Sequence, residues 1–112
     1  MRRDVFQAIA DPVRRDIIGL LAEQRMTVNA VAKQFEISRP AISKHIKILH
    51  ECGMVAIHQQ GRERYCEIQP QSLLPIADWV AQYRDLWEGK LDSFEAYLEQ
   101  LQVKRDSEKP KN

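Results

Sequence analysis

The sequence predicts a mainly α-helical domain with one small β-hairpin, on the basis of three observations. Apolar residues recur at helical spacing in several stretches before residue 53. Two β-prone runs, Val55 to Gln59 and Arg64 to Ile68, then flank a connection that contains glycine, which is the pattern of a hairpin. A long helical pattern follows from Ser72 to Val103. The chain has 112 residues, and we assign residues 1–103 to a single domain.

Composition narrows the class of protein. The chain is 44% hydrophobic and 29% charged, which is typical of soluble globular proteins. No apolar run approaches the ~18 residues that a membrane span needs. The residues after Met1 do not form the apolar segment of a secretion signal, so we expect a cytoplasmic protein that does not contact membranes.

The sequence does not indicate an enzyme. It contains no nucleophile with an evident base, no glycine-rich phosphate loop and no paired carboxylates in one motif. We therefore expect neither catalysis nor a cofactor. The net charge is only +1, but from residue 38 to residue 64 there are five Lys or Arg against two acids, so this stretch is suited to bind phosphates.

Helix-capping residues mark where the first helices begin. Asp11 followed by Pro12 predicts an N-cap and a first helical position, because proline lacks only a donor that this position leaves unused. A short amphipathic helix is expected before it, around Phe6. A helix of that length is not stable alone and must pack on something larger.

Residues 27–52 carry the pattern of two helices joined by a tight turn. Thr27 can cap the first helix, and Ser38 can cap a second that runs to Cys52 and ends at Gly53. A connection of about three residues favours helices that cross steeply, as in a helix-turn-helix. Glu36 stands where such turns often use glycine, which predicts an unfavourable backbone conformation at Glu36.

The second of these helices is amphipathic in a way that suits DNA. On a wheel of ~100° per residue, Ile42, Ile46 and Leu49 share the core side. The opposite side carries hydrogen-bond donors that can reach bases or phosphates in a major groove. With the hairpin of residues 54–68 as a wing, the unit is a winged helix-turn-helix. Its predicted DNA-binding residues are Ser38, Arg39, Pro40, Ser43, Lys44, Lys47, Arg62 and Arg64.

Two other interpretations stay open at this stage. The basic face of this helix could be an ordinary solvated surface. The winged helix could also serve protein contacts without binding DNA.

Three segments together resemble one bacterial family. They are FQAIADPVRRDIIGLL from Phe6, SRPAISKHIKILHECGMV from Ser38 and GRERYCEI from Gly61. In these segments the chain is similar to the ArsR family of winged-helix repressors, over nearly its whole length. The resemblance implies a homodimer that binds a palindromic operator, often in its own promoter, until an effector or a partner protein releases it. We interpret Asp11 to Arg15 as a helix cap with surface or phosphate contacts.

The motif by which metal sensors of that family resemble one another is missing here. The stretch RMTVNAV, Arg25 to Val31, places Thr27 and Asn29 where cysteine ligands would be needed. The last helix also contains no histidine for the family's second type of site. We therefore expect no metal site.

The two cysteines leave one alternative for regulation. Cys52 and Cys66 could approach each other if the end of the second helix packs under the second hairpin strand. A redox- or ligand-responsive repressor that uses these thiols is therefore an alternative to an unliganded one. Two buried, inert cysteines are the simpler expectation.

The pattern from residue 72 to residue 103 indicates an interface between two copies of the chain. Apolar residues recur every seven positions, which is a coiled-coil period. A helix of this length spans about 50 Å, more than one small domain can cover. The predicted dimer-interface residues are Phe6, Leu73, Val80, Tyr83, Trp87, Leu91, Phe94 and Leu98. The alternative is two helices broken near Gly89 and folded back. Residues 104–112 are expected to be a flexible tail.

Overall fold

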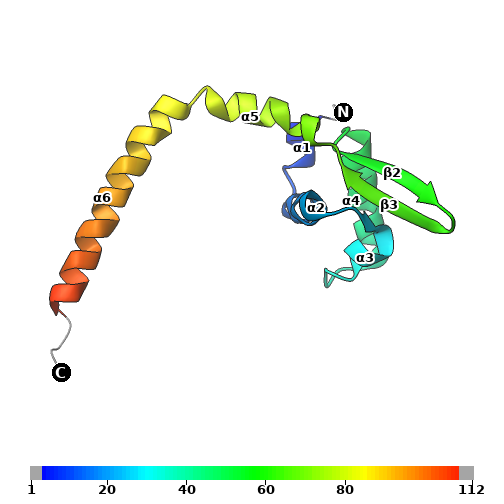
Figure 1. Ribbon diagram of the computed structural model, residues 1–112, viewed down its shortest axis with the longest axis horizontal. Helices are drawn as coiled ribbons and strands as arrows, with labels where there is room; N and C mark the ends of the chain where they lie inside the picture. The colour runs from blue at the N-terminus through cyan, green and yellow to red at the C-terminus, as the bar shows by residue number, and fades with distance from the viewer. Residues whose placement is uncertain (1–3, 109–112) are drawn as a thin grey trace. The chain divides into compact units, whose positions relative to one another are not determined.

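The computed structural model describes residues 4–108, and these fall into two units that meet between Ala77 and Asp78. Each unit is considered by itself. The order of elements is α1 (Val5–Ala8), α2 (Pro12–Glu23), β1 (Met26–Thr27), α3 (Val28–Ala32), α4 (Arg39–Glu51), β2 (Val55–Gln60), β3 (Glu63–Ile68), the 3₁₀ helix η1 (Pro70–Leu73), α5 (Leu74–Ala81) and α6 (Arg84–Glu108) (Figure 1). The predicted winged helix-turn-helix is confirmed.

Side-chain caps begin the first four helices. The carboxylate of Asp11 accepts the backbone N–H of Arg14 at 3.1 Å, and Pro12 takes the first helical position of α2. Thr27 and Ser38 cap α3 and α4 in the same way, with N–H to oxygen distances of 3.0 and 3.3 Å. These three caps are as predicted, and Asp4 adds a fourth at the start of α1.

A small core holds the helices of the first unit together. The predicted inner face of α4 is buried, since Ile42, Ile46 and Leu49 are at most 2% exposed. These side chains pack in one cluster with Ile17 and Leu21 of α2 and with residues of α3 and the strands. Complete burial of such a side chain stabilises a fold by about 1.5–3 kcal/mol. The rotation of α4 about its axis is therefore firmly set.

The turn between α3 and α4 is less strained than the sequence suggested. Among the described residues, only Gly53 and Gly61 have positive φ, so Glu36 does not adopt the left-handed conformation that was expected of it. α3 ends at Ala32, and six residues rather than about three connect it to α4. The longer connection can turn the chain without a left-handed residue.

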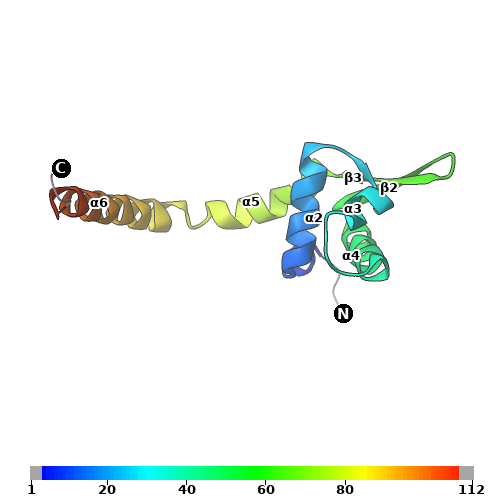
Figure 2. The same cartoon turned by 90° about the horizontal axis from the view of Figure 1, so that it is seen from below.

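A third strand joins the predicted hairpin. β3 lies in the middle of a sheet of order β1-β3-β2, and the short strand β1 pairs Met26 with Cys66 and Thr27 with Tyr65. Each hairpin strand is one residue longer at the tip than predicted, so that only Gly61 and Arg62 form the turn. Gly61 has φ +60° at the first turn position, where two-residue hairpins often use glycine. Figures 1 and 2 both show the tip projecting beyond the helices.

The arginines of the DPVRR segment bind the backbone of α1 and of the residue that follows it. Arg14 donates from Nε to the carbonyl of Ala8 at 2.7 Å and from Nη2 to that of Gln7 at 3.2 Å. Arg15 donates to the carbonyl of Ile9 at 2.7 Å. The arginines thus supply donors to the carbonyls of Ala8 and Ile9 at the end of the helix, and Arg14 adds a donor to the carbonyl of Gln7, which also accepts the N–H of Ala10. The cap predicted at Asp11 is present, and the arginine side chains contact the end of α1, with the bond of Arg15 at the exposed surface.

The same segment touches the predicted DNA-reading helix. Nη1 of Arg14 lies 3.3 Å from Nδ1 of His45 on α4. Burial alone would raise the pKa of Asp11, but the N–H of Arg14 and the charges of His45 and Arg14 hold this pKa below its ordinary value. The stabilising effect of the Asp11 carboxylate is therefore present at neutral pH and is lost as the pH falls through the lowered pKa.

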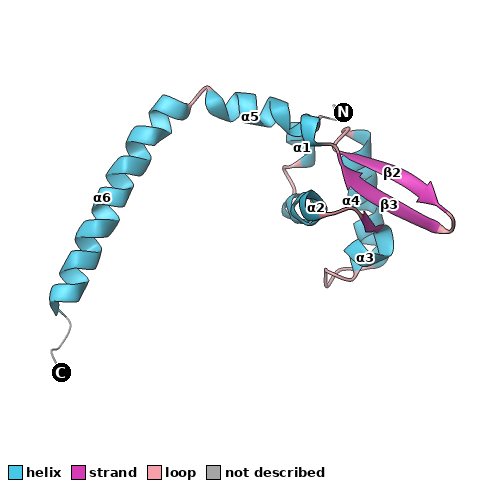
Figure 3. Cartoon of the chain, viewed as in Figure 1, coloured by secondary structure: helices cyan, strands magenta, loops and turns pink. Residues whose placement is uncertain are grey.

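The single helix predicted from Ser72 to Val103 is wrong. The structure has η1, then α5, then a break at Gln82 and Tyr83 before α6 (Figure 3). At the break, the N–H of Tyr83 bonds to the carbonyl of Val80, three residues back instead of four. The alternative break near Gly89 is also wrong, because Gly89 lies inside α6.

α6 is longer than predicted, and its apolar residues are exposed. It continues to Glu108, so the first half of the predicted tail is helical, and residues 109–112 lie outside the described part. Leu91, Phe94 and Leu98 are 47%, 56% and 47% exposed. No helix in the described part is long and apolar enough to cross a membrane.

We predict that Arg14→Ala lowers the free energy of unfolding by about 2 kcal/mol, because two carbonyls lose a charged donor. Arg15→Ala is the matched control. Arg15 is exposed and has one such bond, so its loss should cost less than about 1 kcal/mol. Urea denaturation at one protein concentration measures both. Equal losses would contradict the role assigned to Arg14.

Candidate nucleic-acid interface

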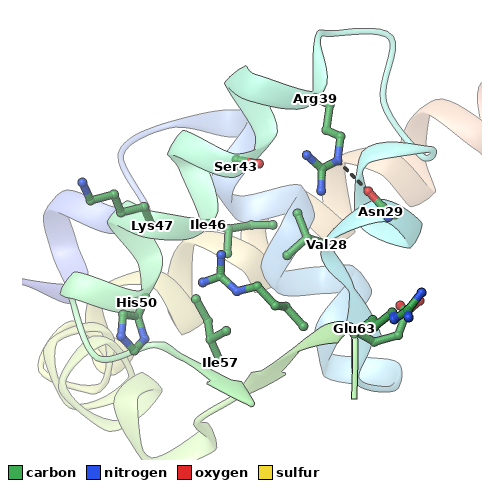
Figure 4. Close-up of a pocket in the computed structure, with 11 residues that line it drawn as sticks. Val28, Asn29, Arg39, Ser43, Ile46, Lys47, His50, Ile57 and Glu63 are labelled. Carbon is green, nitrogen blue, oxygen red and sulfur yellow. Dashed lines mark hydrogen bonds between the residues drawn. The ribbon is translucent and has the colours of Figure 1, made fainter. Parts of the chain in front are cut away.

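The solvent-facing side of α4 borders a cleft. The cleft has a volume of about 490 Å³ and lies between α4, the start of α3 and the hairpin (Figure 4). Five of the residues predicted to bind DNA line it: Arg39, Ser43, Lys47, Arg62 and Arg64. The sequence placed three of them on one helix face and two on the wing, and the fold brings both groups to one cavity.

The other three predicted residues lie on α4 or at its start, outside the cleft. The hydroxyl of Ser38 accepts the N–H of Ala41, so this side chain is engaged as the helix cap. Pro40 and Lys44 are exposed on the first half of α4. This half of a recognition helix usually makes most base contacts.

Apolar side chains contribute to the cleft wall. Val28, Ile46 and Ile57 come from α3, α4 and β2, and Val28 and Ile46 are almost fully buried. Packing between these three elements fixes the distance between the helix and the hairpin. The cations around them are therefore carried on rigid supports.

The electrostatic character of the cleft is cationic. Four arginine or lysine side chains line it against one carboxylate, that of Glu63. Ser43 adds a hydroxyl that can donate or accept a hydrogen bond. Such a lining suits an anionic chain such as a sugar-phosphate backbone, since Lys and Arg attract phosphates and displace their counterions.

Two of the cleft residues outside the predicted site, Asn29 and His50, make hydrogen bonds there. Asn29 of α3 accepts a hydrogen bond from Nε of Arg39 at 2.5 Å. His50 places Nδ1 3.0 Å from the carbonyl of Val55, and because a carbonyl only accepts, Nδ1 carries the hydrogen. His50 lies in the helix whose outer side was predicted to carry hydrogen-bond donors, which was the one available signal. Nothing in the sequence pairs Asn29 with Arg39.

A further cation, which the sequence did not single out, contacts the hairpin at Tyr65 and at Gln60. The guanidinium of Arg25 lies 4.5 Å from the centre of the Tyr65 ring, in cation–π geometry. Arg25 also donates to Gln60 at 3.4 Å. These contacts tie the chain before β1 to both strands of the hairpin.

The positions where metal sensors of the resembled family carry cysteines have other roles here. Thr27 caps α3 through its hydroxyl, and Asn29 binds Arg39. Neither supplies the soft thiolate that zinc or arsenite ions prefer. In residues 4–108, no three His, Cys, Asp or Glu side chains gather where they could hold a metal ion.

The two cysteines differ in accessibility. Cys66 of β3 is 0% exposed, whereas Cys52 at the end of α4 is half-buried, and neither forms a disulfide within the described residues. Burial raises the pKa of the Cys66 thiol, although the charge of Arg64 opposes this. Since the thiolate is the reactive form, Cys66 is poorly placed for oxidation.

Comparisons with known proteins agree with this geometry. Residues 11–56 match the family described as bacterial regulatory protein, arsR family. The transcriptional repressor SdpR of Bacillus subtilis is 35% identical over 80 residues, which are 71% of this chain and 89% of SdpR. The chain belongs to the ArsR family. The resemblance that the sequence suggested is therefore confirmed.

Solved structures of ArsR-family proteins share the fold. The crystal structure of the ArsR family transcriptional regulator RHA00566 superposes with a TM-score of 0.66 at 40% identity, over 74% of this chain and 91% of that one. Mb0332 of Mycobacterium bovis, described as a homodimeric winged helix-turn-helix DNA-binding domain, gives a TM-score of 0.60 at 25% identity, over 75% of this chain and 80% of that one. The family is one of regulators rather than enzymes.

We predict that a thiol reagent distinguishes the two cysteines of the folded protein. In the variant Cys52→Ser, the remaining Cys66 should react at least about 100-fold more slowly under native conditions than in urea, because it must wait for an opening of the fold. The variant Cys66→Ser should react readily without urea. The reagent 5,5′-dithiobis(2-nitrobenzoic acid) reports both rates, and fast native labelling of Cys66 would contradict its burial.

Proposed function

We propose that this ArsR-family protein is a sequence-specific transcriptional repressor that acts as a homodimer on a palindromic operator, including one in its own promoter. The observation that carries the proposal is the cation-lined cleft between α4 and the hairpin. Family membership and the repressor SdpR support the regulatory role. A repressor of this kind works in the cytoplasm, where the chromosome is.

Each element of the cleft takes a role in this proposal. α4 enters the major groove with its first half leading, so that Arg39, Ser43 and Lys44 meet base edges or phosphates. Ser38 orients the helix as its cap, and Pro40 makes an apolar contact. Lys47 lies further along α4 and binds backbone phosphate. From the hairpin, Arg62 and Arg64 reach the adjacent backbone or minor groove.

Dimerisation is proposed through α6 together with α1, η1 and α5, none of which lines the cleft. Trp87, Leu91, Phe94 and Leu98 recur along one side of α6, and each is 44–56% exposed. A row of this spacing is buried when a second helix packs against it. Phe6 of α1, Leu73 of η1, Val80 of α5 and Tyr83 complete the proposed interface, and all except the half-buried Val80 are exposed. Mb0332, described as homodimeric, supports the proposal of a homodimer.

A two-fold dimer explains why the operator should be palindromic. It carries two copies of α4 to one side of the DNA, with half-sites separated by about one helical turn, ~34 Å. A winged helix used only for protein contacts would need no such symmetry and would not require the cations of the cleft. Control through Cys52 and Cys66 is disfavoured because Cys66 is buried.

We predict that Lys47→Ala weakens DNA binding in a salt-dependent manner. Loss of one phosphate contact should reduce the slope of log affinity against log salt concentration by about 0.9 and weaken all sequences alike. Arg39→Ala should instead reduce the preference for the selected operator by about 5- to 100-fold. Fluorescence anisotropy with operator and random DNA at several salt concentrations measures both effects.

Arg15→Ala serves as the matched control for these variants. It removes a cation from α2 that bonds to Ile9 and does not line the cleft, so affinity should be unchanged. If wild-type binding showed neither salt dependence nor sequence preference, the proposed function would be wrong.

We predict that Leu91→Glu converts the dimer to a monomer at micromolar concentration, because it buries a carboxylate in an apolar seam. Val103→Glu is the control. Val103 is 69% exposed on the same helix, and a wheel of ~100° per residue places it opposite the row. Sedimentation velocity measures the mass of each variant. A Leu91→Glu variant that remained dimeric would contradict the assignment of α6 to the interface.

A further inference from the structure

We propose that Asn29 is a positioning residue for DNA readout: it holds the guanidinium of Arg39 in one orientation and thereby sets the base preference of the N-terminal end of α4. The inference rests on the proposed function, because it assumes that Arg39 meets DNA. It gives a role to a position that metal sensors of the family use differently.

The contact joins the two helices of the helix-turn-helix. Nε of Arg39, the first residue of α4, donates to Oδ1 of Asn29, the second residue of α3, at 2.5 Å. The two residues are ten positions apart in the chain, so only the fold brings them together. Figure 4 shows this bond at the edge of the cleft, with Ser43 one turn further along α4.

Both ends of the bond stand on fixed backbone. Asn29 lies between the cap Thr27, which also pairs with Tyr65 in the sheet, and the fully buried Val31. Arg39 follows the cap Ser38 and precedes the fully buried Ile42. The amide of Asn29 therefore presents its oxygen from a rigid support, although both side chains are exposed.

The chemistry of a guanidinium makes this orientation informative. Arginine has five N–H groups in one plane, and the Nε–H of Arg39 donates to Oδ1 of Asn29. Among residues 4–108, the Arg39 guanidinium has no other hydrogen-bond or ion-pair partner. Its two terminal nitrogens remain for a bidentate contact such as that with O6 and N7 of guanine. A side chain that is already aligned loses less conformational freedom on binding.

The same bond has an opposite possible consequence. If Asn29 held Arg39 away from DNA, removing the amide would increase affinity. The sign of the effect of Asn29→Ala therefore separates positioning from sequestration.

The test begins with selection of bound sequences from random DNA by the full wild-type chain. We expect Asn29→Ala to bind the selected operator about 5- to 20-fold more weakly, with less than about twofold change on random DNA. We also expect a loss of preference at one base position of each half-site. The melting temperature should stay unchanged, because the side chain is exposed.

A double-mutant cycle attributes the effect to Arg39. In the background Arg39→Ala, Asn29→Ala should cause no further loss of operator preference. Asn29→Asp keeps an acceptor for Nε and should retain the base preference, although its charge weakens binding to all DNA alike. Gln34→Ala removes an exposed amide from the turn that follows α3 and should leave both measurements unchanged.

The outcomes separate the two levels of the proposal. A wild-type chain that selects no sequence refutes the proposed function and the inference with it. A wild-type chain that selects an operator, together with an unchanged or tighter-binding Asn29→Ala variant, refutes the inference alone. Additive losses in the double-mutant cycle would do the same.

Discussion

Burial of the inner face of α4 is the constraint on which the rest of the first unit depends. Ile42, Ile46 and Leu49 are almost fully withdrawn from water, so α4 cannot rotate without exposing them. Because a helix has two sides, this burial turns Arg39 and Lys47 toward the cleft. The position of these cations is thus a consequence of apolar packing.

The hairpin is coupled to the helices through its base and through the middle of β3. β3 pairs with β1 immediately before α3, and Val55 of β2 is buried in the core beside α4. The cap Thr27 belongs to β1 and also begins α3. Consequently α3, α4 and the hairpin form one connected framework, and the packing of this framework determines the cleft between them. The Arg14 contacts add α1 and α2 to this framework.

The second unit differs from the first in the exposure of its apolar side chains. α6 exposes a row of apolar side chains that no segment of the described chain covers within that unit. Exposed contiguous apolar surface of this kind is characteristic of association. A first unit packed around a core and a helix with an uncovered apolar row fit the proposed regulator that acts as a homodimer.

The sequence by itself determined the starts of α2, α3 and α4, the inner face of α4 and the hairpin, because caps, helical periodicity and a turn glycine are local signals. It also indicated the family and five residues of the cleft. Tertiary structure decided what local signals cannot contain: the pairing of β1 with β3, the bond between Asn29 and Arg39 and the contact of Arg14 with α1. It also placed the break at Gln82 and Tyr83, where no proline or glycine marks it. Such features join distant residues or depend on backbone geometry, so periodicity along the chain does not reveal them.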